Sequence, residues 1–185
     1  QSFSTDQDNG IVFICEDQNT LDALRQRFLT FALDVNKDLD RCGFPLCKGN
    51  IMASNPQWCL SLEEWKDQFS QWIRQPHPDA LLNATIFFDF RPLFGKHELA
   101  EAMRRHLLAQ TAQSPMFLRA MAKNALDVEP PLGKIRDFLT DLEPDHPGKI
   151  DLKKYGSRIF VDVARIYAMA SGVHNTNSIQ RLRIR

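Results

Sequence analysis

The sequence lacks any excess of charge of one sign and any long hydrophobic run. Its 185 residues include 23 lysines plus arginines and 23 aspartates plus glutamates, so the formal net charge is zero. Proteins that neutralise many phosphates carry a basic excess, so we expect no binding to nucleic acid. No stretch of about 18 apolar residues occurs, so we expect no membrane-spanning helix.

Cysteine is scarce as well. The four cysteines, Cys15, Cys42, Cys47 and Cys59, are too few and too irregularly spaced for a disulfide framework in a chain of this length. They also lack the two close pairs that are typical of a structural zinc site. We therefore expect reduced thiols in a cytoplasmic protein.

The chain does contain the composition of an ordinary globular protein, with 43% hydrophobic and 25% charged residues. The apolar pattern predicts an α/β region over residues 1–112 and an all-helical region over residues 113–185. Buried strands are predicted at 11–15 and 84–90. The predicted helices are about 20–40, a short helix after a capping box at Ser61 and Glu64, 95–109, 115–126, 133–142, 156–171 and a last helix from Asn175.

Two of these segments carry further expectations. Apolar residues recur at helical spacing in the first helix, namely Leu21, Leu24, Phe28, Phe31, Val35 and Leu39. In the helix after the capping box, Trp65, Phe69 and Trp72 are predicted to form a core face. The loop between these helices either closes over a ligand or is a rigid packing element pinned by Trp58.

Two carboxylates stand at the entrance to the first predicted strand, within Thr5-Asp6-Gln7-Asp8-Asn9-Gly10. Residues two apart in an extended segment project to the same face, so Asp6 and Asp8 are expected to lie together. They repel each other unless a divalent cation such as Mg²⁺ joins them. The alternative is a solvated turn that caps the strand, because a bare D-x-D pattern is common by chance.

A third acid, Asp89, lies inside the apolar run that predicts the second strand. Alternation places Phe87, Asp89 and Arg91 on one face of that strand. An ionised side chain buried there needs a partner. The partner is either Arg91 or a metal ion shared with the D-x-D strand, and the residues alone leave these two interpretations nearly even.

Several motifs occur along nearly the whole chain: T-D-Q-D-N-G at 5–10, G-F-P-L-C at 43–47, M-A-S-N-P-x-W at 52–58, F-F-D-F-R-P at 87–92, D-L-K-K-x-G at 151–156 and A-R-x-Y-A at 164–168. Together they resemble the nucleotidyltransferase-like family often found downstream of CBS or cyclic-nucleotide-binding domains. That family is similar to PII uridylyltransferase and glutamine synthetase adenylyltransferase, which belong to the polymerase-β-like nucleotidyltransferase superfamily.

The resemblance implies an α/β fold, with a small mixed sheet of the polymerase-β-like type and flanking helices, followed by a helical bundle. It implies a bacterial signalling enzyme that uses Mg²⁺ or Mn²⁺ to transfer a nucleoside monophosphate from an NTP to a regulatory protein. The acceptor would be PII-like or glutamine-synthetase-like, and an upstream CBS or cyclic-nucleotide-binding domain and a homodimer are further expectations.

The resemblance also assigns residues. Asp6, Asp8 and Asp89 would hold the metal and act in catalysis, with Asp89 able to accept the proton of the attacking hydroxyl. Arg91 and Ser2 would contact the nucleotide, although pairing with Asp89 is the favoured alternative for Arg91.

The sequence departs from this family at the nucleotide-binding motif. The family carries G-S-x-x-R-x-E-Q before the D-x-D, and Gln1 corresponds to the last letter of that stretch. We therefore expect the chain as given to bind metal but to be defective in nucleotidyl transfer. The alternative function is a catalytically inactive nucleotide-sensing or assembly module of the same fold. In the helical region, Arg165 is expected to pair with an acid of residues 1–112.

Overall fold

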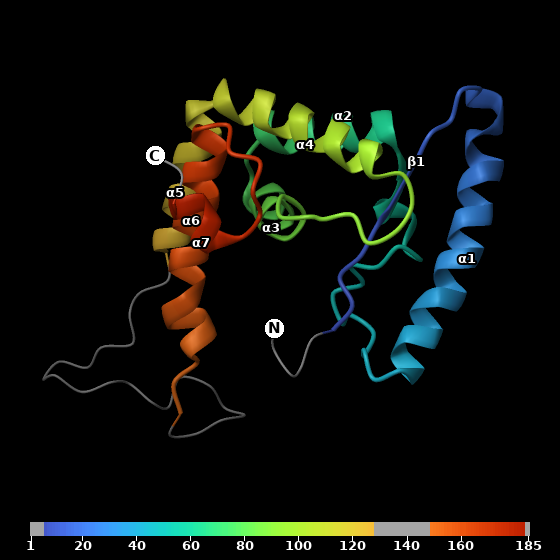
Figure 1. Ribbon diagram of the computed structural model, residues 1–185, viewed down its shortest axis with the longest axis horizontal. Coiled ribbons are helices and arrows are strands. Elements are labelled where there is room, and N and C mark those ends of the chain that lie inside the picture. Colours follow the sequence, from blue (N-terminus) through green and yellow to red (C-terminus); the bar gives the residue numbers. More distant parts are fainter. Residues whose placement is uncertain (1–5, 128–148, 184–185) are drawn as a thin grey trace, which may run out of the picture. The chain divides into compact units, whose positions relative to one another are not determined.

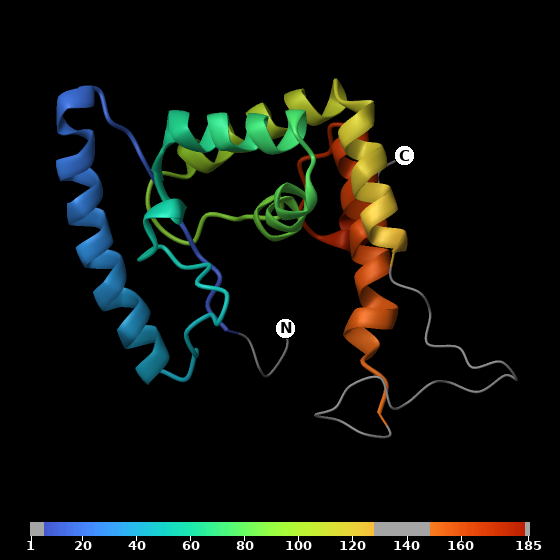
Figure 2. The ribbon, with the colours of Figure 1, turned by 180° about the vertical axis from the view of Figure 1, so that it is seen from behind.

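The computed structural model of this chain describes residues 6–127 and 149–183. It divides into two compact units, Gln1–Gln68 with Lys96–Met103 and Phe69–Gly95 with Arg104–Arg185 (Figures 1 and 2). Helices α2 (Leu62–Arg74) and α4 (His97–Ala112) each begin in the first unit and end in the second. The described residues form a mixed α/β structure in which helices predominate, as expected. The predicted division at residues 112 and 113 stays a prediction.

The sheet of the first unit has two short parallel strands, β1 (Ile11–Phe13) and β2 (Cys59–Ser61). Ile11 lies opposite Cys59, and Phe13 lies opposite Ser61. The first predicted strand is therefore confirmed. The partner strand, β2, was not predicted. It has only three residues, which are too few to show a recognisable alternating pattern.

The long helix α1 (Leu21–Arg41) confirms the prediction for this segment. It follows a 3₁₀ turn, Gln18–Thr20, in which the Asp17 carboxylate accepts a hydrogen bond from Asn19 N at 2.9 Å. Its buried side chains are Ala32 and Asn36. Phe31, which belongs to the apolar pattern, is 59% exposed, so that pattern does not mark the buried face along the whole helix.

The entrance to α2 confirms the predicted capping box. Ser61 N donates to the Glu64 carboxylate at 2.8 Å, and Glu64 N donates to Ser61 Oγ at 3.3 Å. Glu64 also binds Arg25 of α1 at 2.5 Å, so the cap and an ion pair share one carboxylate. The three aromatic residues predicted for the core face of α2, Trp65, Phe69 and Trp72, are all buried.

The prediction of a strand at 84–90 is wrong. Residues 84–87 are the last residues of a helix, α3 (Pro78–Phe87), and residues 88–90 follow the helix without forming a strand. The His77 ring accepts a hydrogen bond from Ala80 N at 3.3 Å, and Pro78 occupies the first turn, where its missing N–H costs nothing. The buried residues of α3, Ala80, Leu81, Ala84 and Phe87, recur at helical spacing. The strand alternation that grouped Phe87 with Asp89 therefore does not apply.

The second unit is built from α3, the last part of α2, the last part of α4 and three more helices. These are α5 (Pro115–Leu126), α6 (Arg158–Ala170) and α7 (Ser178–Arg183), with a π-helical turn at Lys153–Ser157 before α6. Helices α5, α6 and α7 lie side by side in Figures 1 and 2. The helices predicted at 95–109, 115–126, 156–171 and near 175 are confirmed, whereas the one predicted at 133–142 lies outside the described residues.

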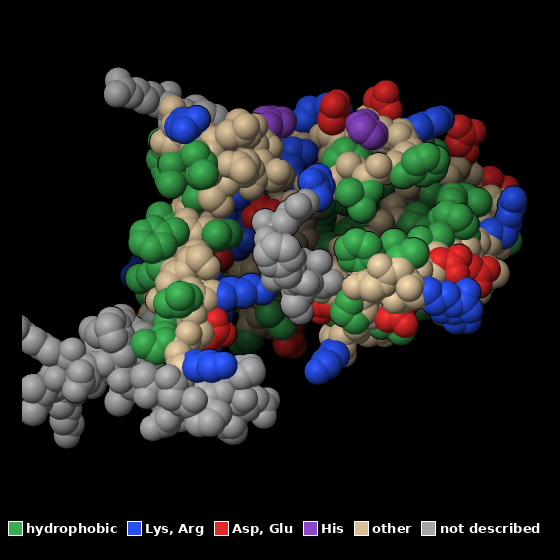
Figure 3. Space-filling view, turned by 60° about the horizontal axis from the view of Figure 1, so that its bottom comes forward, with side chains coloured by type: hydrophobic (Ala, Val, Ile, Leu, Met, Phe, Trp, Pro, Cys, Tyr) green, Lys and Arg blue, Asp and Glu red, His purple; other side chains and the backbone are tan. Residues whose placement is uncertain are grey.

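Helix α6 buries two charged residues together with Ala164, Ala168 and Met169, and it exposes several large apolar residues. Asp162 and Arg165 are buried, whereas Phe160, Val163 and Tyr167 are exposed, with Phe160 at 71%. Figure 3 shows hydrophobic side chains on the surface of the helices at the left of the view. None of the helices in the described residues is long and apolar enough to cross a membrane.

Candidate functional site

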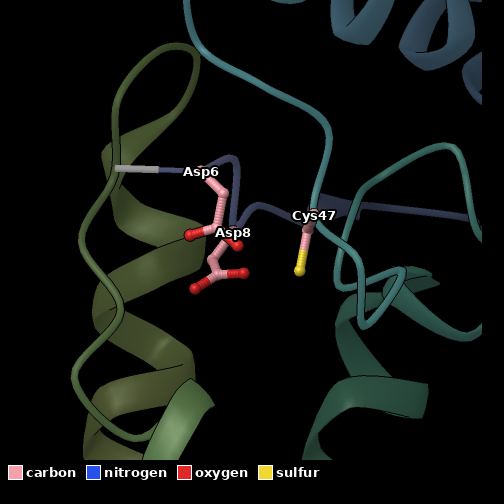
Figure 4. A group of neighbouring side chains, drawn as sticks. All are labelled: Asp6, Asp8 and Cys47. Atoms are coloured by element: carbon pink, nitrogen blue, oxygen red, sulfur yellow. The ribbon is translucent and has the colours of Figure 1, made fainter. Parts of the chain in front are cut away.

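Asp6 and Asp8 meet a third possible ligand group, the thiol of Cys47. One carboxylate oxygen of each aspartate and Cys47 Sγ all lie within 4.8 Å of one another. Both aspartates are exposed, and Cys47 is half-buried. Figure 4 shows the two carboxylates next to each other, with the sulfur of Cys47 facing them from the neighbouring loop. The prediction that Asp6 and Asp8 lie together is confirmed.

Backbone hydrogen bonds hold the D-x-D segment against this loop. Gln7 N donates to Pro45 O at 3.1 Å, and Asn9 N donates to Ile51 O at 3.0 Å. At Gly10 a Cβ atom would lie 3.0 Å from Trp58 O. Only glycine fits this approach without a shift of the backbone, so the glycine of the motif lets the segment pack closely before it enters β1.

The loop itself is pinned by Trp58, as one of the two expectations for it stated. Trp58 is buried, and its indole Nε1 donates to Asn50 O at 3.1 Å. The same carbonyl oxygen accepts from Asn55 Nδ2 at 3.1 Å. The loop that carries Cys47 is thus tied to the first unit at both the D-x-D segment and the tryptophan.

The environment keeps Cys47 in its thiol form. Burial raises its pKa, and the hydrogen bond with Asp8 and the charge of that carboxylate raise it further, although backbone hydrogen bonds with Ile51 and Gly49 oppose the rise. Sequence reasoning treated Cys47 only as a reduced thiol. The G-F-P-L-C motif was the one available signal, but the separation of Asp8 and Cys47 in sequence hid their proximity.

Asp89 lies just after α3 and belongs to the second unit. Its Oδ2 accepts from Arg165 Nε at 2.9 Å and from Arg165 Nη2 at 2.8 Å, and its Oδ1 accepts from Arg181 Nη2 at 2.5 Å. The expected pairing of Arg165 with an acid of residues 1–112 is confirmed. The expected pairing of Asp89 with Arg91 is wrong, because Asp89 pairs with Arg165 and Arg181, and Arg91 is exposed.

The arginine partners decide the ionisation of Asp89. Burial alone raises the pKa of this carboxyl, but the hydrogen bonds and charges of Arg181 and Arg165 outweigh that effect and lower it. Arg165 also binds Asp162 at 2.5 Å, so the two acids and two arginines form one network, in which Asp89 is half-buried and the other three residues are buried. The roles predicted for Asp89 in metal binding and catalysis stay predictions.

Arg104 lies close to this network. Its guanidinium donates to the carbonyl oxygens of Phe88 and Phe90, and its central carbon lies 4.1 Å from the centre of the Phe90 ring. Burial lowers the pKa of Arg104 to about 10, the Asp89 charge raises it and the Arg181 charge lowers it. The turn after α3 is therefore held by a cation that binds its backbone.

The two nucleotide-binding residues expected from the sequence receive no structural support. Ser2 lies outside the described residues. Arg91 is exposed, and its predicted contact with the nucleotide stays a prediction.

Comparison with protein families gives two matches. Residues 1–79 match the model described as "Putative nucleotidyltransferase DUF294", and residues 115–184 match the model described as "Putative nucleotidyltransferase substrate binding domain". The first range contains the cluster of Asp6, Asp8 and Cys47, and the second contains Arg165 and Arg181. Comparisons with curated proteins and with solved structures found no significant match.

Proposed function

Because this chain belongs to the DUF294 nucleotidyltransferase family, we propose that it acts in the transfer of a nucleoside monophosphate from an NTP to a hydroxyl group of a regulatory protein. The general nucleotidyltransferase role comes from the two family matches. The finer parts of the proposal are a divalent metal ion at Asp6 and Asp8, a polymerase-β-like catalytic fold and a protein acceptor of the PII or glutamine synthetase kind in bacterial signal transduction.

The observation that carries the proposal is the convergence of the Asp6 and Asp8 carboxylates on the outer side of a tethered segment. Carboxylate oxygens are hard ligands of the kind that Mg²⁺ and Mn²⁺ prefer. Both side chains are exposed, so a hydrated ion and a triphosphate can reach them. The two carboxylates supply the oxygen donors, and Cys47 adds one sulfur atom near them. These residues therefore fit a magnesium or manganese ion.

In the proposed reaction the acceptor hydroxyl oxygen forms a bond to the α-phosphorus of the NTP. The bond from that phosphorus to the bridging oxygen breaks, pyrophosphate leaves, and the hydroxyl proton passes to a base. A metal ion held by Asp6 and Asp8 would offset the negative charge of the triphosphate and of the leaving pyrophosphate. The two carboxylates supply the oxygens that orient such an ion.

The environment of Asp89 does not favour its action as the base in this reaction. A carboxylate whose pKa is lowered by two arginines is a weaker proton acceptor than an ordinary one. Binding a metal ion there would also compete with the charges of Arg165 and Arg181. The proposal therefore rests on Asp6 and Asp8.

The test uses the full-length protein that contains this chain. It follows label transfer from an α-³²P-labelled NTP to purified PII-like and glutamine-synthetase-like proteins, together with pyrophosphate release, in Mg²⁺ or Mn²⁺. We expect Asp8→Asn to lower transfer by about 100-fold or more, because one of the two metal ligands is lost. Asp22→Asn removes an exposed carboxylate from the first turn of α1 and should leave transfer unchanged.

Equal transfer by the wild type and by Asp8→Asn would contradict the proposed metal site. Binding of the metal–NTP complex without any pyrophosphate release would instead favour the catalytically inactive nucleotide-sensing module. Label transfer to a small molecule but to no protein would reject the protein acceptor and leave the metal site standing.

A further inference from the structure

The side chain between the two exposed carboxylates points the opposite way and is buried. Gln7 is 5% exposed. Its Nε2 donates to Asn36 O at 2.9 Å and to Phe44 O at 2.8 Å, and its Oε1 accepts from Asn36 Nδ2 at 2.7 Å. Side chains alternate along an extended segment, so an inward Gln7 goes with outward Asp6 and Asp8.

The partner, Asn36, is the polar residue at the buried face of α1 and is 2% exposed. Its Nδ2 also donates to Asn9 Oδ1 at 3.2 Å, and its Oδ1 accepts from Ser54 N at 3.3 Å. Asn9 Oδ1 accepts in addition from Ala53 N at 2.8 Å. We call the three amide side chains of Gln7, Asn9 and Asn36 the amide clasp.

The amide clasp joins three parts of the first unit: helix α1, the D-x-D segment and the loop that carries Cys47. Each side-chain amide nitrogen and oxygen of Gln7 and Asn36 has a partner. Burying two amides is more demanding than burying two apolar side chains, because every polar atom must be satisfied. In return, a fully bonded network has one preferred arrangement, whereas apolar side chains of the same size tolerate several.

We propose that Gln7 and Asn36 are positioning residues that hold the Asp6 and Asp8 carboxylates in the geometry that binds a divalent metal ion. This inference rests on the proposed function of the same site. The bonds at both ends of the Gln7 amide prevent rotation of the segment about its own axis. Such a rotation would move both carboxylates together, away from their exposed position and toward the loop that carries Cys47.

Two substitutions test the amide clasp, one in the D-x-D segment and one in α1. Gln7→Met keeps the length of the side chain and removes its hydrogen bonds, and Asn36→Leu does the same on α1. One folded variant is enough for the test, because each substitution removes the hydrogen bond from Asn36 Nδ2 to Gln7 Oε1. Ser61→Ala is the matched control, since it weakens the first unit through the capping box and leaves the D-x-D segment untouched.

Binding of Mn²⁺ to the whole chain is measured by isothermal titration calorimetry, with circular dichroism and thermal unfolding recorded for each variant. We expect Gln7→Met and Asn36→Leu each to weaken Mn²⁺ binding about tenfold, which is the lower end of the effect of residues that orient metal ligands. The double variant should bind Mn²⁺ more tightly than the product of the two single effects predicts, because both changes remove the hydrogen bond from Asn36 Nδ2 to Gln7 Oε1. Ser61→Ala should bind Mn²⁺ as the wild type does.

Three other results would overturn the inference, and each points to a different cause. If Asp8→Asn abolishes binding but both clasp variants bind Mn²⁺ within twofold of the wild type, the positioning role is wrong and the metal site stands. If Ser61→Ala weakens binding as much as the clasp variants do, the effect comes from stability rather than position. If the wild type binds no Mn²⁺, the proposed metal site fails and the clasp inference fails with it.

Discussion

Replacement of Asp89 by asparagine is expected to destabilise the second unit by about 3–5 kcal/mol, the usual effect of removing one partner from a buried ion pair. The side chain of Asp89 is 22% exposed, and those of its partners Arg165 and Arg181 are 8% and 3% exposed. Asparagine keeps one oxygen acceptor and no charge, so it cannot compensate two buried guanidinium groups. Arg181 Nη1 already has no hydrogen-bond partner among the described residues.

The assay is urea unfolding followed by circular dichroism, with Arg91→Ala as the matched control from the same turn. Arg91 is exposed, so its loss should change the free energy of unfolding by no more than about 0.5 kcal/mol. A loss below about 1 kcal/mol for Asp89→Asn would refute the reasoning, and so would an equal loss for Arg91→Ala.

The same network predicts a dependence on pH. Arginine partners lower the folded-state pKa of Asp89 below its usual value of 3.8. Its contribution to stability is therefore fully present above that value and is lost as the pH falls through the lowered folded-state pKa. The wild type should lose stability on acidification below about pH 4 more steeply than Asp89→Asn does.

Two further predictions concern the first unit. Ser61→Ala should lower the free energy of unfolding by about 1 kcal/mol in urea titrations, because the N-cap acceptor for Glu64 N is lost, and an unchanged midpoint would contradict the capping geometry. Burial raises the pKa of the Cys59 thiol to about 11, so in the folded chain at pH 8 iodoacetamide should modify the exposed Cys42 while leaving Cys59 unmodified, as counted by mass spectrometry. Modification of both cysteines at equal rates would show that β2 is open to solvent.

Much of the helical structure could be predicted because its signals are local. The start of α5 follows from Ser114 and Pro115, and the capping box at Ser61 and Glu64 predicts the start of α2. Strand β1 follows from a β-branched run behind a polar turn. In each case residues within one turn of each other decide the conformation.

The error at 84–90 shows how local signals can compete. Isoleucine and phenylalanine favour strands, but the helix had already begun at Pro78, and the spacing of Ala80, Leu81, Ala84 and Phe87 continues it. The segment His77-Pro78 has the features of a helix start, because proline is favoured in the first turn, and this signal would have predicted α3. The error mattered because it placed Asp89 in a strand beside Arg91, whereas its partners come from α6 and α7.

The candidate site likewise combines local features, which the sequence predicts, with contacts that depend on the tertiary structure. The sequence by itself determined that two carboxylates lie two residues apart on an extended segment, and this spacing is enough to bring them together. Only the tertiary structure brought Cys47 to them and joined Gln7 to Asn36, 29 residues away. It likewise joined Asp89 to Arg165 and Arg181, which are 76 and 92 residues away. The physical reason is that backbone geometry couples only near neighbours, whereas distant side chains meet only when packing of the helices brings them within hydrogen-bond distance.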